Sequence, residues 1–182
     1  MAMGHQVIHL CGQTAIVPRT CVALERFGSF ADLEARLQQR LGSEPFDMIV
    51  HAAAVSDYTI TEIRSGDRLY PPGMGKIDSS GDLILKLKRN HKILDRLKDY
   101  AIGHPLVVGF KLTNTSSQTE RERAIFKLSL NPAIDFVVHN DFSEIGAEGK
   151  HPFSIYREKT IRHQCDSAKE LAKELLRVGE PS

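Results

Sequence analysis

The sequence predicts an α/β fold, in which a doubly wound, mostly parallel Rossmann-like sheet is flanked by helices and carries a small antiparallel edge. Short apolar runs rich in β-branched residues alternate with longer runs of helical periodicity, which is typical of parallel strands joined by crossover helices. A two-strand pattern near the end of the chain predicts the antiparallel edge. Residues 58–90 break the alternation and predict an inserted flap.

The individual elements follow from these patterns. Four apolar runs predict the parallel strands, at 6–11, 47–53, 106–110 and 135–138. Apolar residues at helical spacing predict four helices, at 30–41 behind a cap at Ser29, at 92–100, at 118–130 and at 167–178. Residues 152–163 predict a hairpin that turns near Glu158 and Lys159. We expect the 182 residues to form a single domain, 1–182.

The inserted segment 58–90 holds four glycines and two prolines before the alternating run DLILKLK, which predicts a strand. This composition is typical of a flap or a dimer arm lying beside the sheet. Its Lys76 stands next to a glycine, where a long cation can reach a ligand. Composition alone leaves a second interpretation open, which is an ordinary solvated loop lysine.

Charge and composition exclude several classes of function. The chain has 24 lysines and arginines against 23 acids, so no net field favours nucleic acid or an anionic membrane. The chain contains neither a long apolar span nor a signal-peptide pattern, and we expect a cytoplasmic protein. Its three scattered cysteines predict reduced, buried side chains. Zinc-helix, glycine-rich dinucleotide, Walker and nucleophile-elbow motifs are missing from the sequence, and metal ligands stay unidentified.

Polar residues follow each predicted parallel strand. They occur at 11–13, 51–57, 109–111 and 139–141. In an open parallel sheet, ligands bind beyond the carboxyl ends of the strands, so we expect these segments to line one site. After the second strand, Ala52 to Ala54 would let a flat ligand lie against the backbone, and Asp57 could accept from a sugar or base. A second interpretation is equally open, in which the alanines pack against a helix and Asp57 caps a helix.

Several motifs occur in the order seen in phosphopantothenoylcysteine synthetase, also called phosphopantothenate-cysteine ligase. They are VHAAAVSDY, GKI at 75–77, LKLKRNHKIL at 85–94, VVGFKL at 107–112 and KLSLNPAIDFVVHND at 127–141. The chain resembles this family, in its stand-alone bacterial form, from about residue 5 to residue 178. The resemblance implies ligation of 4'-phosphopantothenate to L-cysteine in coenzyme A biosynthesis, through an acyl-nucleotide formed from CTP, or from ATP in eukaryotes. It also implies Mg²⁺ and a homodimer in which each flap serves the neighbouring site.

The resemblance also assigns residues position by position. It makes Lys76 the catalytic flap lysine that contacts the phosphates and the acyl adduct. Ala54 is assigned to phosphopantothenate. The residues assigned to the nucleotide are His51, Ala52, Ala53, Asp57, Lys76, Asn90, His91, Lys92, Ile93, Leu94, Phe110, Lys127 and Asn131.

Three departures from the family pattern stand out. His91 and Lys92 replace a proline and an acid in the base-reading turn, and Asn131 replaces the second lysine of a K-x-x-x-K pair. A lost charge-assisted bond costs roughly 1.5 to 3 kcal/mol. The family's first strand, its G-G-T turn and its asparagine-containing segment have no match here, which favours a fragment or shortened gene model over a member without the full reaction.

Two other functions are compatible with parts of this pattern. A non-catalytic nucleotide-binding or interaction subunit could keep the fold without activating the acid. A short-chain dehydrogenase is disfavoured because none of the four tyrosines has a lysine four residues later.

Overall fold

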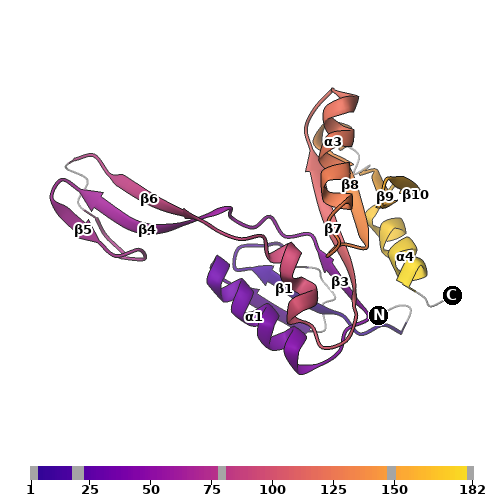
Figure 1. Ribbon diagram of the computed structural model, residues 1–182, viewed down its shortest axis with the longest axis horizontal. Coiled ribbons are helices and arrows are strands. Elements are labelled where there is room, and N and C mark those ends of the chain that lie inside the picture. The colour runs from indigo at the N-terminus through magenta and orange to yellow at the C-terminus, as the bar shows by residue number, and fades with distance from the viewer. Residues whose placement is uncertain (1–3, 18–22, 78–80, 147–150, 180–182) are drawn as a thin grey trace.

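The computed structural model describes residues 4–17, 23–77, 81–146 and 151–179. Its main sheet has five strands in the order β10-β9-β8-β7-β3. The strands β3, β7 and β8 are parallel, and the hairpin β9-β10 adds the antiparallel edge (Figure 1). Their bounds are β3 Met48–His51, β7 Leu106–Thr113, β8 Phe136–Asp141, β9 Phe153–Arg157 and β10 Thr160–Cys165. The predicted fold class, three of its parallel strands and the hairpin are therefore confirmed.

Helices cover both faces of this sheet, as side-chain alternation along its strands requires. On one face, Val108 and Val138 pack against Leu171 and Leu175 of α4 (Ala168–Gly179). On the other, Val107 packs with α1 (Phe30–Ser43) and Val137 with α3 (Gln118–Ser129). All six residues of β8 are buried, so this strand lies at the centre of the core.

The helix boundaries follow local signals. The side chain of Ser29 accepts a hydrogen bond from the amide of Asp32 and caps α1, as predicted. Ser117 caps α3 in the same way. The single helix predicted at 92–100 is instead a 3₁₀ turn, η1 (Ile93–Arg96), followed by one short helix, α2 (Leu97–Tyr100). A further 3₁₀ turn, η2 (Phe142–Glu144), follows β8.

The first predicted strand lies outside the main sheet. β1 (Ile8–Gly12) pairs in parallel with β2 (Ala23–Phe27), which the sequence pattern did not predict, and the two form a separate sheet. Among the described residues, β1 and β3 each have one hydrogen-bonded neighbour strand. The doubly wound architecture is therefore interrupted between these two strands.

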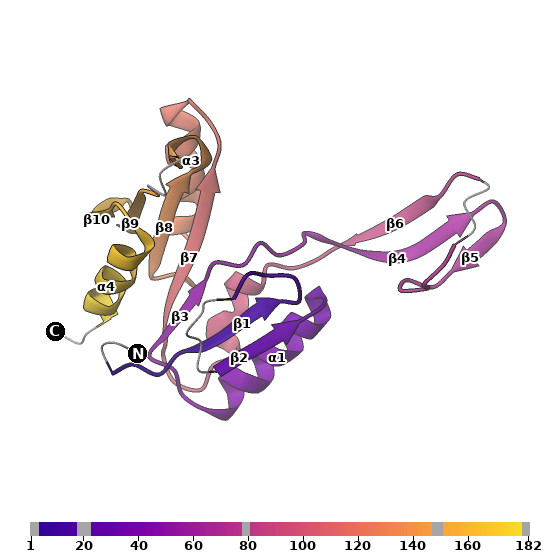
Figure 2. The ribbon, with the colours of Figure 1, turned by 180° about the vertical axis from the view of Figure 1, so that it is seen from behind.

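Residues 58–77 and 81–90 form an antiparallel arm that projects far from the body of the molecule (Figures 1 and 2). Its strands have the order β5-β4-β6, with bounds β4 Tyr58–Ser65, β5 Arg68–Tyr70 and β6 Ile84–Arg89. Only β6 was predicted as a strand. Every residue of β6 is exposed, which is consistent with a segment that has no core of its own.

No helix in the described ranges is both long enough and apolar enough to cross a membrane.

Candidate functional site

A cavity of about 770 Å³ opens beyond the carboxyl ends of β3 and β7, between η1 and α3. This is the place where an open α/β sheet binds its ligands. It gathers every predicted site residue except Lys76 and Asn90, namely His51, Ala52, Ala53, Ala54, Asp57, His91, Lys92, Ile93, Leu94, Phe110, Lys127 and Asn131. The structure thus brings together residues that lie 80 positions apart in the sequence.

The wall after β3 consists of backbone and methyl groups. Ala52 to Ala54 are exposed and line the cavity, so they do not pack under a helix. The carboxylate of Asp57 pairs with the ammonium of Lys92, and this hydrogen bond lowers the pKa of Asp57. Within the described residues, Asp57 therefore neutralises Lys92 instead of capping a helix, which contradicts the packing interpretation of this segment.

Asn90 lies at the base of the arm. Its side-chain amide donates to the carbonyl of Ser56 at 3.0 Å and accepts from the hydroxyl of Thr59 at 2.8 Å. Its backbone amide donates to the carbonyl of Asp57 at 2.8 Å. These three bonds tie the two ends of the arm together where it leaves the body. Asn90 is thus placed as a structural clasp beside the cavity.

The ring of His91 contacts α1. Its Nε2 lies 2.7 Å from a carboxylate oxygen of Glu34, and the hydroxyl of Tyr100 donates to the same oxygen. The bond from Tyr100 is the main cause that lowers the pKa of Glu34. His51, at the end of β3, has its pKa lowered by burial and is therefore neutral at physiological pH. Of these two imidazoles, only His91 faces a carboxylate.

The wall formed by α3 and the turn that follows it holds Lys127 and Asn131. The Asn131 amide donates to a carboxylate oxygen of Asp95 at 2.6 Å, and its carbonyl accepts from the amide of Ala133 at 3.0 Å. Lys127 is exposed, and within the described ranges it makes no hydrogen bond or ion pair. Lys127 is therefore free to meet an anion in the cavity.

The cavity also contains residues that the sequence interpretation did not assign. They are Lys111, Asn140, Asp95, Ser56, Val55, Leu112 of β7, and Ala124 and Leu128 of α3. The signal for Lys111 and Asn140 was present, because 109–111 and 139–141 were marked as polar strand ends. The Asn140 amide lies 2.8 Å from Nε2 of His151, which links the cavity to the segment before β9.

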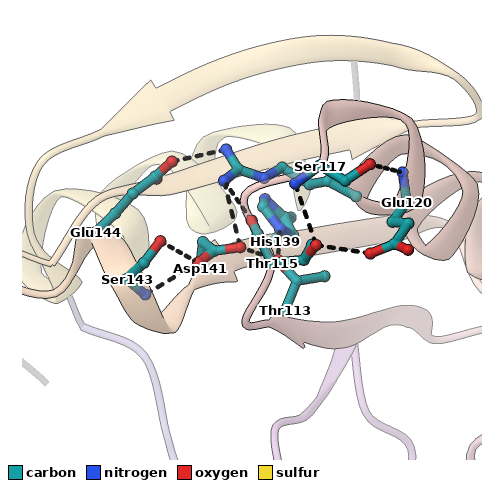
Figure 3. Close-up of polar contacts among 9 residues, drawn as sticks. Thr113, Thr115, Ser117, Glu120, His139, Asp141, Ser143 and Glu144 are labelled. Atoms are coloured by element: carbon teal, nitrogen blue, oxygen red, sulfur yellow. Dashed lines mark hydrogen bonds and ion pairs between the residues drawn. The ribbon is translucent and has the colours of Figure 1, made fainter.

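Behind this wall lies a buried polar network at the ends of β7 and β8 (Figure 3). Asp141 is fully buried and accepts from the amide of Ser143 at 2.9 Å, from the Ser143 hydroxyl at 2.6 Å and from the Thr113 hydroxyl. Arg121 of α3 lies 3.4 Å from the same carboxylate and 2.7 Å from Glu144. The hydrogen bonds from Ser143 and Thr113 hold the pKa of Asp141 far below its usual range.

The protonation of His139 follows from this network. The Thr113 hydroxyl has one proton, which it donates to Asp141. The contact of 2.8 Å between Thr113 and Nε2 of His139 therefore requires Nε2 to carry the proton and donate. Burial, with the nearby charge of Arg121, lowers the pKa of His139, so the imidazole is neutral at pH 7.

A second cavity, of about 570 Å³, separates β1 from β3. Every residue of both strands lines it, with Leu33, Leu37 and Leu41 of α1. We call this second cavity the strand groove. The same three alanines, 52–54, border the strand groove and the first cavity.

Lys76 is exposed on the arm and lines neither cavity of its own chain. In the described part of the chain, no cluster of three or more histidine, cysteine or acidic side chains could hold a metal ion.

An open α/β sheet with a cavity beyond its strand ends defines a broad class of ligand-binding proteins. Within that class, this chain belongs to the family described as the DNA/pantothenate metabolism flavoprotein C-terminal domain, which it matches over residues 1–178.

Individual relatives agree with this family. The chain is 31% identical over 143 residues to the coenzyme A biosynthesis bifunctional protein CoaBC of Thermococcus kodakarensis, covering 79% of this chain and 33% of that protein. It thus spans about a third of the curated relative. A crystal structure of the DNA/pantothenate metabolism flavoprotein from Streptococcus pneumoniae superposes with a TM-score of 0.79, at 21% identity, over 97% of this chain and 81% of that one. This likeness shows the fold.

A more distant structure is that of a Cab2 mutant in complex with phosphopantothenate-cysteine. It has a TM-score of 0.55 and 16% identity, and the match covers 86% of this chain and 52% of the Cab2 chain.

Proposed function

We propose that this chain acts in coenzyme A biosynthesis as a nucleotide-dependent ligase that joins 4'-phosphopantothenate to L-cysteine. The observation that carries the proposal is the cavity, which collects almost all residues assigned from the family resemblance. Membership of the family supports the pathway. The phosphopantothenate-cysteine bound to the Cab2 neighbour supports the substrate class.

The proposed reaction has two steps. The carboxylate of 4'-phosphopantothenate attacks the α-phosphorus of CTP, the bond to the β-phosphate breaks, and pyrophosphate leaves. The cysteine amine then attacks the acyl carbon, loses a proton and displaces CMP. Both steps bring anions together, so cations at the cavity and exact positioning of the reactants lower the barrier.

The chain's own residues fit separate parts of this chemistry. The exposed backbone at Ala52 to Ala54 offers a surface for a flat base, and Phe110 lines the same cavity. Asp57, held near Lys92, can accept from a base amine or a sugar hydroxyl. Lys127 can meet a phosphate.

Magnesium would enter with the nucleotide. Mg²⁺ is usually held by one or two carboxylates together with substrate phosphates, which fits a cavity whose carboxylates are Asp57 and Asp95. When bound, the ion would neutralise negative charge on the phosphates.

We further propose a homodimer in which the arm of one copy brings Lys76 to the cavity of the other. The arm projects away from its own body and exposes apolar side chains such as Leu69, Ile84 and Leu87. Lys76 on this arm is far enough from its own cavity not to line it.

Pyrophosphate release tests the proposed ligase. The full chain is incubated with CTP, Mg²⁺, 4'-phosphopantothenate and cysteine, and pyrophosphate and product are measured, with ATP in place of CTP as the comparison. We expect release that depends on the acid, with CTP preferred. Lys76→Ala abolishes turnover without lowering the melting temperature, because the residue is exposed, and Lys173→Ala on α4 serves as the control. Unchanged turnover in Lys76→Ala would remove that residue from the site.

A second candidate is a nucleotide-binding subunit without ligase activity. The observation that favours it is the strand groove, which opens the alanine wall of the cavity from behind and would admit water to a reactive acyl-nucleotide. Stabilisation by CTP in a thermal-shift titration, without pyrophosphate release in the presence of the acid, would decide for this candidate.

A further inference from the structure

The cavity needs cations that are not already neutralised if it is to hold phosphate groups. Lys92 is paired with Asp57, and His91 with Glu34. Asn131 contributes no charge and is engaged with Asp95. Of the positions assigned from the sequence, this leaves Lys127 as the free cation that lines the cavity in the described part of the chain.

Lys111 is a second free cation at the same cavity. It is half-buried near the end of β7 and is directly paired in register with His139 of β8. No hydrogen bond or ion pair joins it to another residue in the described ranges. Its four-carbon stem is thus fixed at its base by the sheet while its ammonium group lacks a counter-ion.

The neighbouring glycine explains how the side chain reaches the cavity. Gly109 and Lys111 lie on the same face of β7, since residues two apart in a strand share a face. A Cβ at Gly109 would lie 3.1 Å from a methyl group of Leu94 and 3.5 Å from Ile134. η1 therefore packs closely over Gly109, and Lys111 is the next side chain on that face, at the rim between η1 and α3.

The buried network around Asp141 contains no carboxylate that is free to pair with Lys111. Asp141, two positions along from His139 on the same strand face, is already shared by Thr113, Ser143 and Arg121. Burial is the main cause that lowers the pKa of His139; the charges of Arg121 and Lys111 lower it further, whereas those of Asp141 and Glu144 raise it. Both of these carboxylates are paired with Arg121, and in the described residues neither is paired with Lys111, so the charge of Lys111 has no partner. An anionic group entering the cavity would find this charge uncompensated.

We propose that Lys111 and Lys127 form a two-cation clamp for the phosphate chain of a nucleotide, in which Lys111 supplies the charge that the asparagine at position 131 lacks. One cation comes from the sheet and the other from α3, on two walls of one cavity. The identity of the phosphate donor rests on the proposed function. The two-lysine arrangement itself rests on this chain's geometry.

Calorimetric titration of the full chain tests the clamp with three probes, which are inorganic tripolyphosphate, CTP and cytidine. The variants are Lys111→Met, Lys111→Arg, Lys127→Met and the double Lys111→Met/Lys127→Met, with Lys173→Met on the opposite face as the control. Methionine keeps the apolar stem and removes the charge.

We expect Lys111→Met to weaken tripolyphosphate and CTP about tenfold, as loss of a charge-assisted contact predicts. Cytidine, which has no phosphate, binds equally to all variants. Lys111→Arg keeps most of the affinity, and the salt dependence of CTP binding becomes shallower in each methionine variant. Lys173→Met changes nothing.

The outcomes separate this inference from the proposed function. Normal affinity for both phosphate probes in Lys111→Met, with loss in Lys127→Met, overturns the clamp and leaves nucleotide binding intact. Binding of tripolyphosphate that depends on both lysines, without CTP being preferred over it, supports the clamp and counts against the nucleotide. Failure of the wild-type chain to bind either phosphate probe overturns both.

Discussion

The two halves of the molecule differ in how completely their strands are paired, and one register pair shows the difference directly. Val50 of β3 and Val108 of β7 are partners in the parallel ladder and lie on the same sheet face. Val108 is fully buried beneath α4, whereas Val50 is 48% exposed. On the β8 side, neighbouring strands and helices bury all six residues of the strand. On the β3 side, the sheet ends at the strand groove.

The cavity lies at the border between these halves. Its β7 and α3 walls are backed by the buried network of Asp141 and Arg121. Its alanine wall is backed by the groove, where the edges of β1 and β3 are open in the described structure. We therefore expect the β7 and α3 walls to hold their charged groups in place before a ligand binds. The position of the alanine wall should depend on what occupies the strand groove.

The largest expected effect is on the closed side. Asp141→Ala leaves Arg121 and the Thr113 hydroxyl without their buried partner, and breaking such a pair is strongly destabilising. We expect the melting temperature to fall by on the order of 10 °C. The matched control is Glu144→Ala, which removes the exposed partner of the same arginine. It should change the melting temperature by less than about 3 °C.

Equal shifts in the two variants would show that Asp141 is no more important than a surface acid. The stronger burial on the β8 side would then not make its polar groups more important for stability.

A matched pair of valine substitutions measures the difference in packing. Val108→Ala should lower the free energy of unfolding by about 2 kcal/mol, because it leaves a void under α4. Val50→Ala, with a half-exposed side chain, should change it by less than about 0.5 kcal/mol. Urea unfolding of both variants gives the values.

A cost for Val50→Ala close to that of Val108→Ala would mean that Val50 is covered in solution. A strand or helix from another molecule, or from polypeptide outside these residues, would then occupy the open side.

The sequence predicted the features that follow from local patterns and missed those that depend on contacts between distant residues. The gathering of His51, Phe110 and Lys127 was predictable, because parallel strands must end at the same edge of a sheet. β2 was missed because its run ALERF places two charged residues among three apolar ones. The clasp role of Asn90 was not predictable, because its partners lie more than 30 positions away.

The same limit applies to Lys111 and Lys92. Both lie within motifs that the sequence marked, yet only the fold determines which lysine has a carboxylate beside it. An ion pair such as that of Lys92 with Asp57, 35 positions apart, leaves no local pattern.

The pH dependence of stability provides a smaller effect on the closed side. Burial lowers the pKa of His139 in the folded protein below its unfolded value, near 6.5. The unfolded chain therefore binds the proton first, and the stability that neutral His139 contributes is lost as pH falls from above 7 toward the folded pKa. His139→Gln should flatten the fall of the melting temperature between about pH 7 and pH 5. Parallel curves for the two proteins would contradict the buried, neutral imidazole.

The smallest effect concerns Asp57, at the open wall. Asp57→Ala removes an acceptor for the base or sugar but also frees Lys92, whose charge can then attract the phosphates. Because the two changes oppose each other, we expect CTP to bind only about threefold more weakly, and cytidine to lose more than CTP. Lys92→Met is the matched control, since it frees the carboxylate without adding a cation. Calorimetry with both ligands separates the two contributions. Unchanged cytidine affinity in Asp57→Ala would show that Asp57 does not bind the base or sugar and only forms its ion pair with Lys92.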